Sequence, residues 1–209
     1  MQLEPLLRQE NNVIENIQRV WASCGLFDQV CLCNTYIYLM RQNLGEEAAE
    51  AERHATQIKV QSVQFGTALG LSPDQLGNLS RVAFLHEIGK VGLAQTATAK
   101  KGCLSAAEKA ILRWHPEIGY RIIMAMTGQE EVAKGVRALY ERWDGKGYPT
   151  GISGQTIPLN ARIVSLVHAY DDLTKGTFYE HPFPHKQALA KIKSEAGFSA
   201  SLLLYLFQH

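Results

Sequence analysis

The sequence lacks the features of a disulfide-rich, secreted or membrane-spanning chain. Its four cysteines include no C-x-x-C pair, so nothing indicates a disulfide framework, and we expect free thiols in a reducing compartment. The first ten residues, MQLEPLLRQE, lack the basic segment and apolar core that mark a signal peptide. The longest apolar stretch, Val30–Met40, is interrupted by Asn34 and is too short to cross a bilayer. These absences predict a cytoplasmic protein that does not bind membranes.

The sequence also lacks an excess of charge of either sign. Its 21 lysines and arginines stand against 20 aspartates and glutamates, a net charge of +1. This balance gives no electrostatic basis for binding DNA, RNA or a membrane surface, although a small anionic ligand needs only a few local cations. Hydrophobic residues make up 46% of the 209 residues, which is enough for a substantial core.

No strand-like alternation persists and no repeat is visible, whereas helical periodicity is widespread. The residues Ser72-Pro73-Asp74-Gln75 have the pattern of a capping box, and Gly89 is expected to cap the end of the helix that follows. The pattern predicts an all-α fold, with a helical hairpin at residues 1–45 and one main domain at residues 46–209. The other expected helices span residues 3–24, 27–43, 46–69, 105–115, 117–126, 130–142 and 158–174, with one or two closing helices that include 202–206.

The stretch Arg81–Lys90, RVAFLHEIGK, concentrates reactive side chains where a helix is expected to end. His86 and Glu87 are metal-ligand types, and His86 continues the inward helical stripe seven residues after Leu79. Lys90, one turn later, is placed to neutralise a bound phosphate. The stretch therefore predicts a metal-centred chemistry on phosphate, which needs further ligands from elsewhere in the chain.

Candidate ligands occur on several other expected helices. Glu50 and His54 share one helical face, and His168 and Asp171 share a face of a later helix. A bundle in which side chains from several helices converge is a common way to build a metal site. The predicted metal ligands are Glu50, His54, His86, Glu87, His115, His168 and Asp171.

Residues 144–158, DGKGYPTGISGQTIP, contain four glycines and two prolines and predict a long loop. Loops of this length in compact domains are usually functional or disordered. The same glycines and prolines also fit a loop whose only role is to follow a turn-rich path.

These residues resemble a known family. FLHEIGK resembles the LHDIGK of HD-domain phosphohydrolases, and KKGCLSAAEKAILRWHPEIGYRII resembles the segment that carries the HP motif of the HD-GYP subgroup. ERWDGKGYPTGISGQTIPLNARI is similar to that subgroup's ERWDGxGYPxGLxGxxIPLxARI. The resemblance runs from about Glu50 to the C-terminus. It implies an HD-domain helical bundle and a metal-dependent phosphodiesterase, since most known members act on cyclic di-GMP in bacteria.

The resemblance also implies roles for individual residues. Glu50 corresponds to a glutamate that binds an extra metal in some members, Asp171 to the second aspartate of a D-x-[FY]-D-A-L-T run, and Lys90 to a lysine that contacts the substrate phosphate. Glu87 stands at the aspartate that bridges the metals. The remaining implied metal ligands are His54, His86 and His115.

The implied chemistry is the attack of metal-activated water on a phosphodiester bond. The substrate would be a cyclic dinucleotide or another small phosphodiester. The mixed nitrogen and oxygen ligands favour one or two ions of Mn, Fe, Ni or Zn. Glu87 and Lys90 would act in catalysis. The expected substrate contacts are Lys90, Arg142, Lys146 and Tyr148.

The sequence departs from the subgroup at several positions. Leu139 and Tyr140 replace two adjacent histidines, His168 replaces a metal-binding aspartate, and Thr177 replaces an arginine that contacts substrate. His168 and Glu87 are nevertheless still ligand types. These departures leave open a second hypothesis, an impaired domain that senses a nucleotide or binds a protein, and a third, a structural helical module.

The candidate residues also have purely structural interpretations. His86 on an apolar stripe is what a buried core histidine looks like, and His115 before a proline fits a helix cap. Lys90 and Glu87 fit an ordinary ion pair. Metal binding is favoured because several ligand positions match together. Beyond the site, we expect a homodimer through the N-terminal helices and a protein partner at the 144–158 loop.

Overall fold

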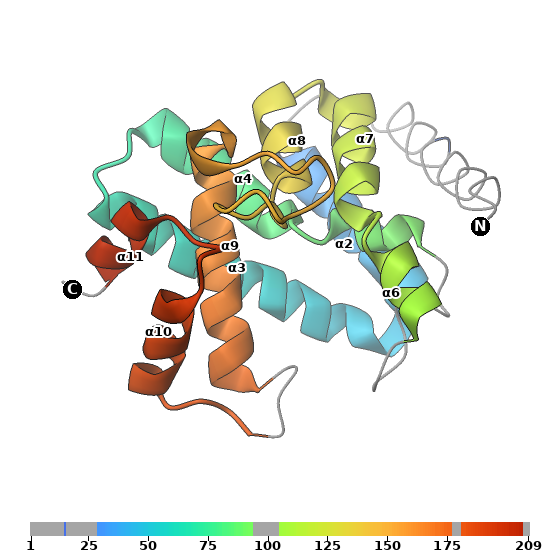
Figure 1. Ribbon diagram of the computed structural model, residues 1–209. Coiled ribbons are helices and arrows are strands. Elements are labelled where there is room, and N and C mark those ends of the chain that lie inside the picture. Colours follow the sequence, from blue (N-terminus) through green and yellow to red (C-terminus); the bar gives the residue numbers. More distant parts are fainter. Residues whose placement is uncertain (1–14, 16–28, 94–104, 177–180, 207–209) are drawn as a thin grey trace.

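The computed structural model describes residues 15, 29–93, 105–176 and 181–206, and this part of the chain contains helices and loops but no strand (Figure 1). The all-α prediction is therefore confirmed. The α-helices are α2 (Gln29–Leu44), α3 (Ala48–Ala68), α4 (Pro73–Leu85), α6 (Ala106–Leu112), α7 (His115–Thr127), α8 (Glu130–Arg137), α9 (Leu159–Lys175), α10 (His185–Ser194) and α11 (Ala200–Leu206). Short 3-10 turns are η1 (Gly45–Glu47), η2 (Ile88–Gly92) and η3 (Gly154–Thr156).

Helices α3, α4 and α9 pack on one another at the centre, and α7 and α8 lie over α4 and η2. In Figure 1, α9 crosses α3 near the middle of the molecule. Their shared core includes Ile58, Leu79 and Leu166, each at most 1% exposed. Burial of such a side chain contributes about 1.5–3 kcal/mol, so this three-helix contact can hold polar groups rigidly at its edge.

The start of α4 is fixed locally, as its sequence predicts. The Ser72 hydroxyl accepts a hydrogen bond from the Gln75 backbone N–H at 3.3 Å, and the Gln75 side chain accepts one from the Ser72 N–H at 2.9 Å. This capping box with Pro73 at the first turn confirms the predicted helix start.

The end of α4 differs from the prediction. The helix stops at Leu85, and Gly89 lies within η2 rather than at a helix cap. A Cβ atom on Gly89 would lie 1.8 Å from the carbonyl oxygen of His115. Glycine is therefore needed because α7 begins directly against η2, a tertiary contact that the local sequence does not reveal.

The loop from Glu141 to Ile157 is tied down by a buried carboxylate. Glu141, which is 5% exposed, accepts hydrogen bonds from the Thr150 N–H and hydroxyl, both at 2.6 Å, and from the Gly151 N–H at 3.0 Å. A Cβ atom on Gly147 would lie 2.4 Å from the backbone nitrogen of Arg142. The loop is thus packed onto its own first residues, and only η3 interrupts its irregular path.

Apart from residue 15, the predicted helix at residues 3–24 lies outside the described residues, as does Thr177. Helix α2 matches the second helix of the predicted hairpin, and its Tyr36 and Met40 join the main core. The division at residue 45 stays a prediction. Among the described residues, no helix combines the length and the hydropathy that crossing a bilayer requires.

Candidate metal centre

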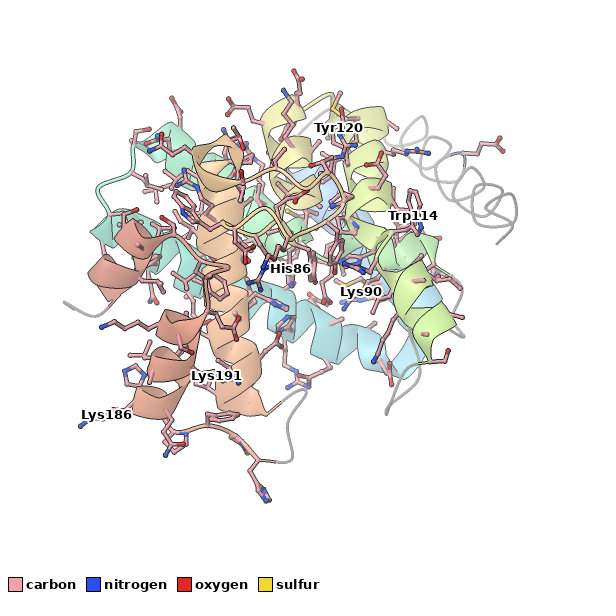
Figure 2. The ribbon with its side chains drawn as sticks, viewed as in Figure 1. His86, Lys90, Trp114, Tyr120, Lys186 and Lys191 are labelled. Atoms are coloured by element: carbon pink, nitrogen blue, oxygen red, sulfur yellow. The ribbon has the colours of Figure 1, made fainter. Side chains whose placement is uncertain are left out.

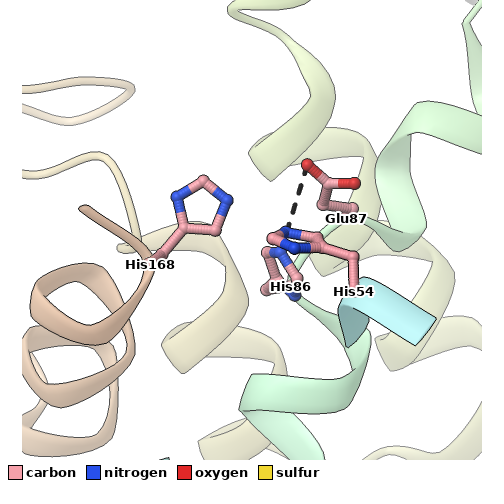
Figure 3. Close-up of side chains that lie close together, drawn as sticks. All are labelled: His54, His86, Glu87 and His168. Carbon is pink, nitrogen blue, oxygen red and sulfur yellow. Dashed lines mark ion pairs between the residues drawn. The ribbon is translucent and has the colours of Figure 1, made fainter. Parts of the chain in front are cut away.

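Four predicted ligands meet at the centre of the fold. One ligand atom each from His54, His86, Glu87 and His168 lies within 4.8 Å of the other three. The residues come from α3, from the end of α4 and from α9, and Figure 3 shows the His168 ring facing His54 and His86. The three ring centroids are 5.0–5.2 Å apart. Side chains more than a hundred residues apart in sequence thus enclose one small volume.

The orientation of His86 leaves one nitrogen free. Its Nδ1 lies 2.8 Å from the carbonyl oxygen of Ala83, which can only accept, so Nδ1 carries the proton. Nε2 therefore holds a lone pair, and it is buried without a hydrogen-bond partner. A buried acceptor without a partner costs about 1–3 kcal/mol, and coordination of a cation would satisfy it. Figure 2 shows His86 near the middle of the molecule.

The other two imidazoles are oriented by carboxylates. His54 Nδ1 lies 3.3 Å from Asp171 Oδ2, and His168 Nδ1 lies 3.2 Å from Asp172 Oδ2. Because each Nδ1 faces a carboxylate, each ring is left with Nε2 as its ligand atom. The same tautomer is thus favoured at all three histidines.

The electrostatics suit a cation. Burial lowers the pKa of His86 to about 3, against a smaller opposing effect of Glu87, and burial also lowers the pKa of His168. Burial alone would raise the pKa of Glu87, but Lys90 and His86 hold it well below its usual value. At neutral pH the group therefore offers neutral imidazoles and an ionised carboxylate, the protonation states that metal ligands require. The residues fit a divalent transition metal with nitrogen and oxygen ligands.

Three other predicted ligands lie outside this group. Glu50 is on the first turn of α3 with a 65% exposed side chain, and it pairs with Arg53. The Asp171 carboxylate lies behind His54 and is already engaged, because it accepts a hydrogen bond from Gln57 at 2.8 Å and pairs with Lys175 at 3.0 Å. Asp171 therefore lies where it can orient His54, and its role as a direct ligand stays a prediction.

His115 is buried but does not supply one of the four clustered ligand atoms. Its Nδ1 donates to the Leu112 carbonyl at 2.6 Å, and its ring meets the edge of Tyr140 with centroids 4.9 Å apart. Burial lowers the pKa of His115 to about 4. Its Nε2 has no hydrogen-bond partner, yet it is not among the four clustered ligand atoms. Burial raises the pKa of Tyr140 well above its usual value, so this phenol is a weak replacement for a histidine ligand.

A cavity of about 300 Å³ adjoins the group. Its lining includes His86, His168 and Asp172, together with Tyr140, Arg142 and Tyr148. Such a volume is at the lower end of those that hold small-molecule ligands.

The predicted substrate residues are not equivalent in this cavity. The Tyr148 ring stacks on Tyr140, with centroids 5.2 Å apart and an interplanar angle of 20°. Arg142 reaches the cavity but makes two hydrogen bonds to Asp144, at 3.0 and 2.8 Å. Lys146 is exposed and does not line the cavity, and neither does Lys90, which pairs with Glu87.

Asp172 was missed at the level of sequence. It follows His168 by four residues, the spacing at which side chains meet on a helix, and this was the signal that could have identified it. The lining of the cavity by Leu139 and Ser165 depends on tertiary packing, and no local pattern marks it.

Comparison with known proteins identifies the family. The HD domain family matches residues 39–200. A cyclic di-GMP phosphodiesterase of Thermotoga maritima is 31% identical over 150 residues, which cover 71% of this chain and 41% of that protein. A 3'3'-cGAMP-specific phosphodiesterase 2 of Vibrio cholerae is 27% identical over 177 residues, which cover 83% of this chain and 34% of that protein.

The fold is also found in solved structures. An HDG"Y"P protein from Bdellovibrio bacteriovorus superposes with a TM-score of 0.64 at 17% identity, covering 96% of this chain and 69% of that one. The chain spans less than half the length of each of these two phosphodiesterases. With the GYP loop at Gly147-Tyr148-Pro149 and the clustered histidines, these matches show that the chain belongs to the HD domain family, in its HD-GYP subgroup.

Proposed function

We propose that this chain is a metal-dependent phosphodiesterase that hydrolyses a cyclic dinucleotide. The observation that carries the proposal is the convergence of His54, His86, Glu87 and His168 within 4.8 Å, beside a cavity of about 300 Å³. A divalent ion held there would supply Lewis acidity and lower the pKa of a water molecule. A single group of four ligand atoms favours one ion, of Mn, Fe, Ni or Zn.

Each residue of the group has a part in holding the ion. The three imidazoles would bind through Nε2, because their Nδ1 atoms are engaged by Ala83, Asp171 and Asp172. Glu87 adds a negative charge that balances part of the charge on the cation. Lys90 lies against Glu87, and displacement of this ammonium toward substrate would place a positive charge near the scissile phosphate.

The cavity walls suit a nucleotide. Tyr140 and Tyr148 line the cavity with their rings stacked on each other, so a base that displaces the Arg113 guanidinium from Tyr148 would gain an aromatic face on which to stack. Arg142 is at the wall, although its pair with Asp144 offsets much of its charge. The two relatives are named for cyclic di-GMP and for 3'3'-cGAMP, so we propose a purine cyclic dinucleotide as the substrate.

The proposal includes a location and partners. We propose a cytoplasmic protein, in keeping with a soluble nucleotide substrate. Dimerisation through the N-terminal helices and binding of a protein to the GYP loop remain predictions from the sequence.

The test combines metal content with turnover. Chain purified without chelator should contain close to one transition-metal ion and should hydrolyse cyclic di-GMP or 3'3'-cGAMP, and bis(p-nitrophenyl) phosphate. His86→Ala and Glu87→Ala should lose metal and activity together. Glu130→Ala removes an exposed carboxylate that pairs with Lys134, and this variant should retain both.

A second candidate function is nucleotide sensing without hydrolysis. It is favoured by Tyr140, a bulky neutral side chain that packs against His115 at a position where the subgroup has a histidine. Tight binding of cyclic di-GMP with no cleavage, in the presence of Mn²⁺ or Fe²⁺, would select this function instead.

A further inference from the structure

The helix α9 contains a carboxylate and an imidazole that act as a pair. Asp172 Oδ2 lies 3.2 Å from His168 Nδ1, one helical turn away. Both residues line the cavity, and their side chains are only 17% and 18% exposed. The pair therefore sits at the wall of the proposed site, partly shielded from solvent.

The pair determines which nitrogen of His168 faces the other ligands. At 3.2 Å the Nδ1–H group can donate to the carboxylate, which favours the tautomer with a free Nε2 lone pair. The opposite orientation or tautomer would place N–H against the cluster, where a cation would repel it. The His168 ring lies 5.2 Å from that of His54 and 5.0 Å from that of His86.

We propose that Asp172 is a positioning residue of the metal centre, which holds His168 in the ligand tautomer and raises the basicity of its Nε2. The proposal rests on the metal-dependent function proposed above. Carboxylate groups that accept from a ligating histidine typically strengthen metal binding by 10–100-fold.

An ordinary ion pair is the competing explanation for the same contact. The two explanations differ in what they leave for a metal, because only a neutral ring keeps its Nε2 lone pair for a cation. A neutral ring beside the ionised carboxylate gains orientation from the contact and keeps its second nitrogen for a metal.

Asp171 plays a comparable part for His54, but its carboxylate also ties α3 to α9 through Gln57. Its removal would therefore disturb helix packing as well as the ligand. The Asp172–His168 pair lies within a single helix, which makes Asp172 the better residue to test.

The test measures Co²⁺ binding to the metal-free chain by titration, together with the visible absorption spectrum of the bound ion. Asp172→Ala should weaken Co²⁺ binding 10–100-fold and alter the spectrum. Asp172→Asn should lose less, because its amide oxygen still accepts from Nδ1–H. Glu130→Gln is the matched control, because Glu130 is also a helical carboxylate that pairs with a residue four positions later, Lys134. This variant should bind Co²⁺ normally.

A double-variant comparison identifies the route of the effect. If Asp172 acts through His168, Asp172→Ala should cause no further loss of Co²⁺ affinity in a His168→Ala background. An equal loss in both backgrounds would overturn the proposal. Thermal unfolding of each metal-free variant checks folding, and Asp172→Asn carries the test if Asp172→Ala does not fold.

The outcomes separate this inference from the proposed function. If the unaltered chain binds Co²⁺ and Asp172→Ala binds it with the same affinity and spectrum, the positioning role is refuted while the metal site stands. If the unaltered chain binds no Co²⁺, both the metal-dependent function and the inference fail.

Discussion

Glu141 accepts hydrogen bonds from both the backbone N–H and the hydroxyl of Thr150, each at 2.6 Å, and so ties one end of the GYP loop to its middle. Because Arg142 and Tyr148 of the cavity wall lie between these two anchors, the shape of the cavity depends on this buried carboxylate.

Glu141→Ala should lower the free energy of unfolding by roughly 1.5–3 kcal/mol, since the hydrogen bonds from Thr150 and Gly151 to a buried, charged acceptor are lost. Glu141→Gln keeps one acceptor oxygen and should lose less. Urea unfolding measures both, with the exposed Glu130→Ala as a control expected within about 0.5 kcal/mol of the parent. Equal stability of Glu141→Ala and Glu130→Ala would show that the loop does not depend on this contact.

Gly89→Ala should destabilise the fold and disturb the metal centre. The added Cβ would meet the His115 carbonyl oxygen at 1.8 Å, so η2 must move away from α7 and carry Glu87 with it. We expect a loss of about 1–3 kcal/mol or more, accompanied by weaker Co²⁺ binding.

Gly77→Ala is the matched control for this change. Gly77 lies inside α4, and its added Cβ would meet nothing closer than the Arg81 guanidinium at 3.7 Å. It should leave Co²⁺ binding unchanged and stabilise the helix by roughly 0.5–1 kcal/mol. Similar behaviour of the two variants would contradict the close approach of η2 and α7.

The stability of the metal-free chain should fall as the pH is lowered from about 6.5. Burial lowers the folded-state pKa of His86 to about 3 and that of His115 to about 4, below the usual value of 6.5. In this range the unfolded chain binds protons that the folded chain does not, so stability is lost as pH falls and is fully present above 6.5. Each group contributes a slope of about 1.4 kcal/mol per pH unit until its folded-state pKa is reached.

Urea unfolding in the presence of a chelator, at pH values from 7 to 4.5, measures this slope. His115→Gln removes one of the two groups and should flatten the curve. A stability that stays constant across this range would mean that these imidazoles are not buried in the neutral form.

Tyr148 should contribute to nucleotide affinity rather than to metal binding. Its ring stacks on Tyr140 and lies under the Arg113 guanidinium, 4.5 Å from its centroid. A base that displaces the Arg113 guanidinium would stack on this ring, and such a stack contributes about 1–3 kcal/mol, so Tyr148→Leu should weaken cyclic di-GMP binding roughly 5- to 150-fold. Tyr148→Phe keeps the ring and should bind nearly normally. Calorimetric titration of the Co²⁺-loaded variants checks this, and unaltered affinity of Tyr148→Leu would place the base elsewhere.

Sequence reasoning succeeded where interactions are local or the residue types are distinctive. The capping box at Ser72 involves residues three apart, and the structure has it as predicted. The clustering of His54, His86, Glu87 and His168 follows from ligand types on inward helical faces, which hydrophobic packing then brings together.

The remaining differences come from tertiary packing. Whether Asp171 binds a metal or orients His54 depends on how α3 crosses α9, and spacing along one helix does not determine that angle. The end of α4, before Gly89, depends on the position of α7. Helix α7 begins at His115, 26 residues after Gly89. The direction of the His115 ring likewise depends on Tyr140, a neighbour from another segment.

The central claim is that three imidazoles bind one ion at this site, and X-ray absorption spectroscopy of the Zn²⁺-loaded chain tests it most directly. We expect a fine-structure signal of three histidine ligands at about 2.0–2.1 Å with an oxygen ligand, reduced to two histidines in His168→Ala. A spectrum with one histidine or none, or one that His168→Ala leaves unchanged, would contradict the account.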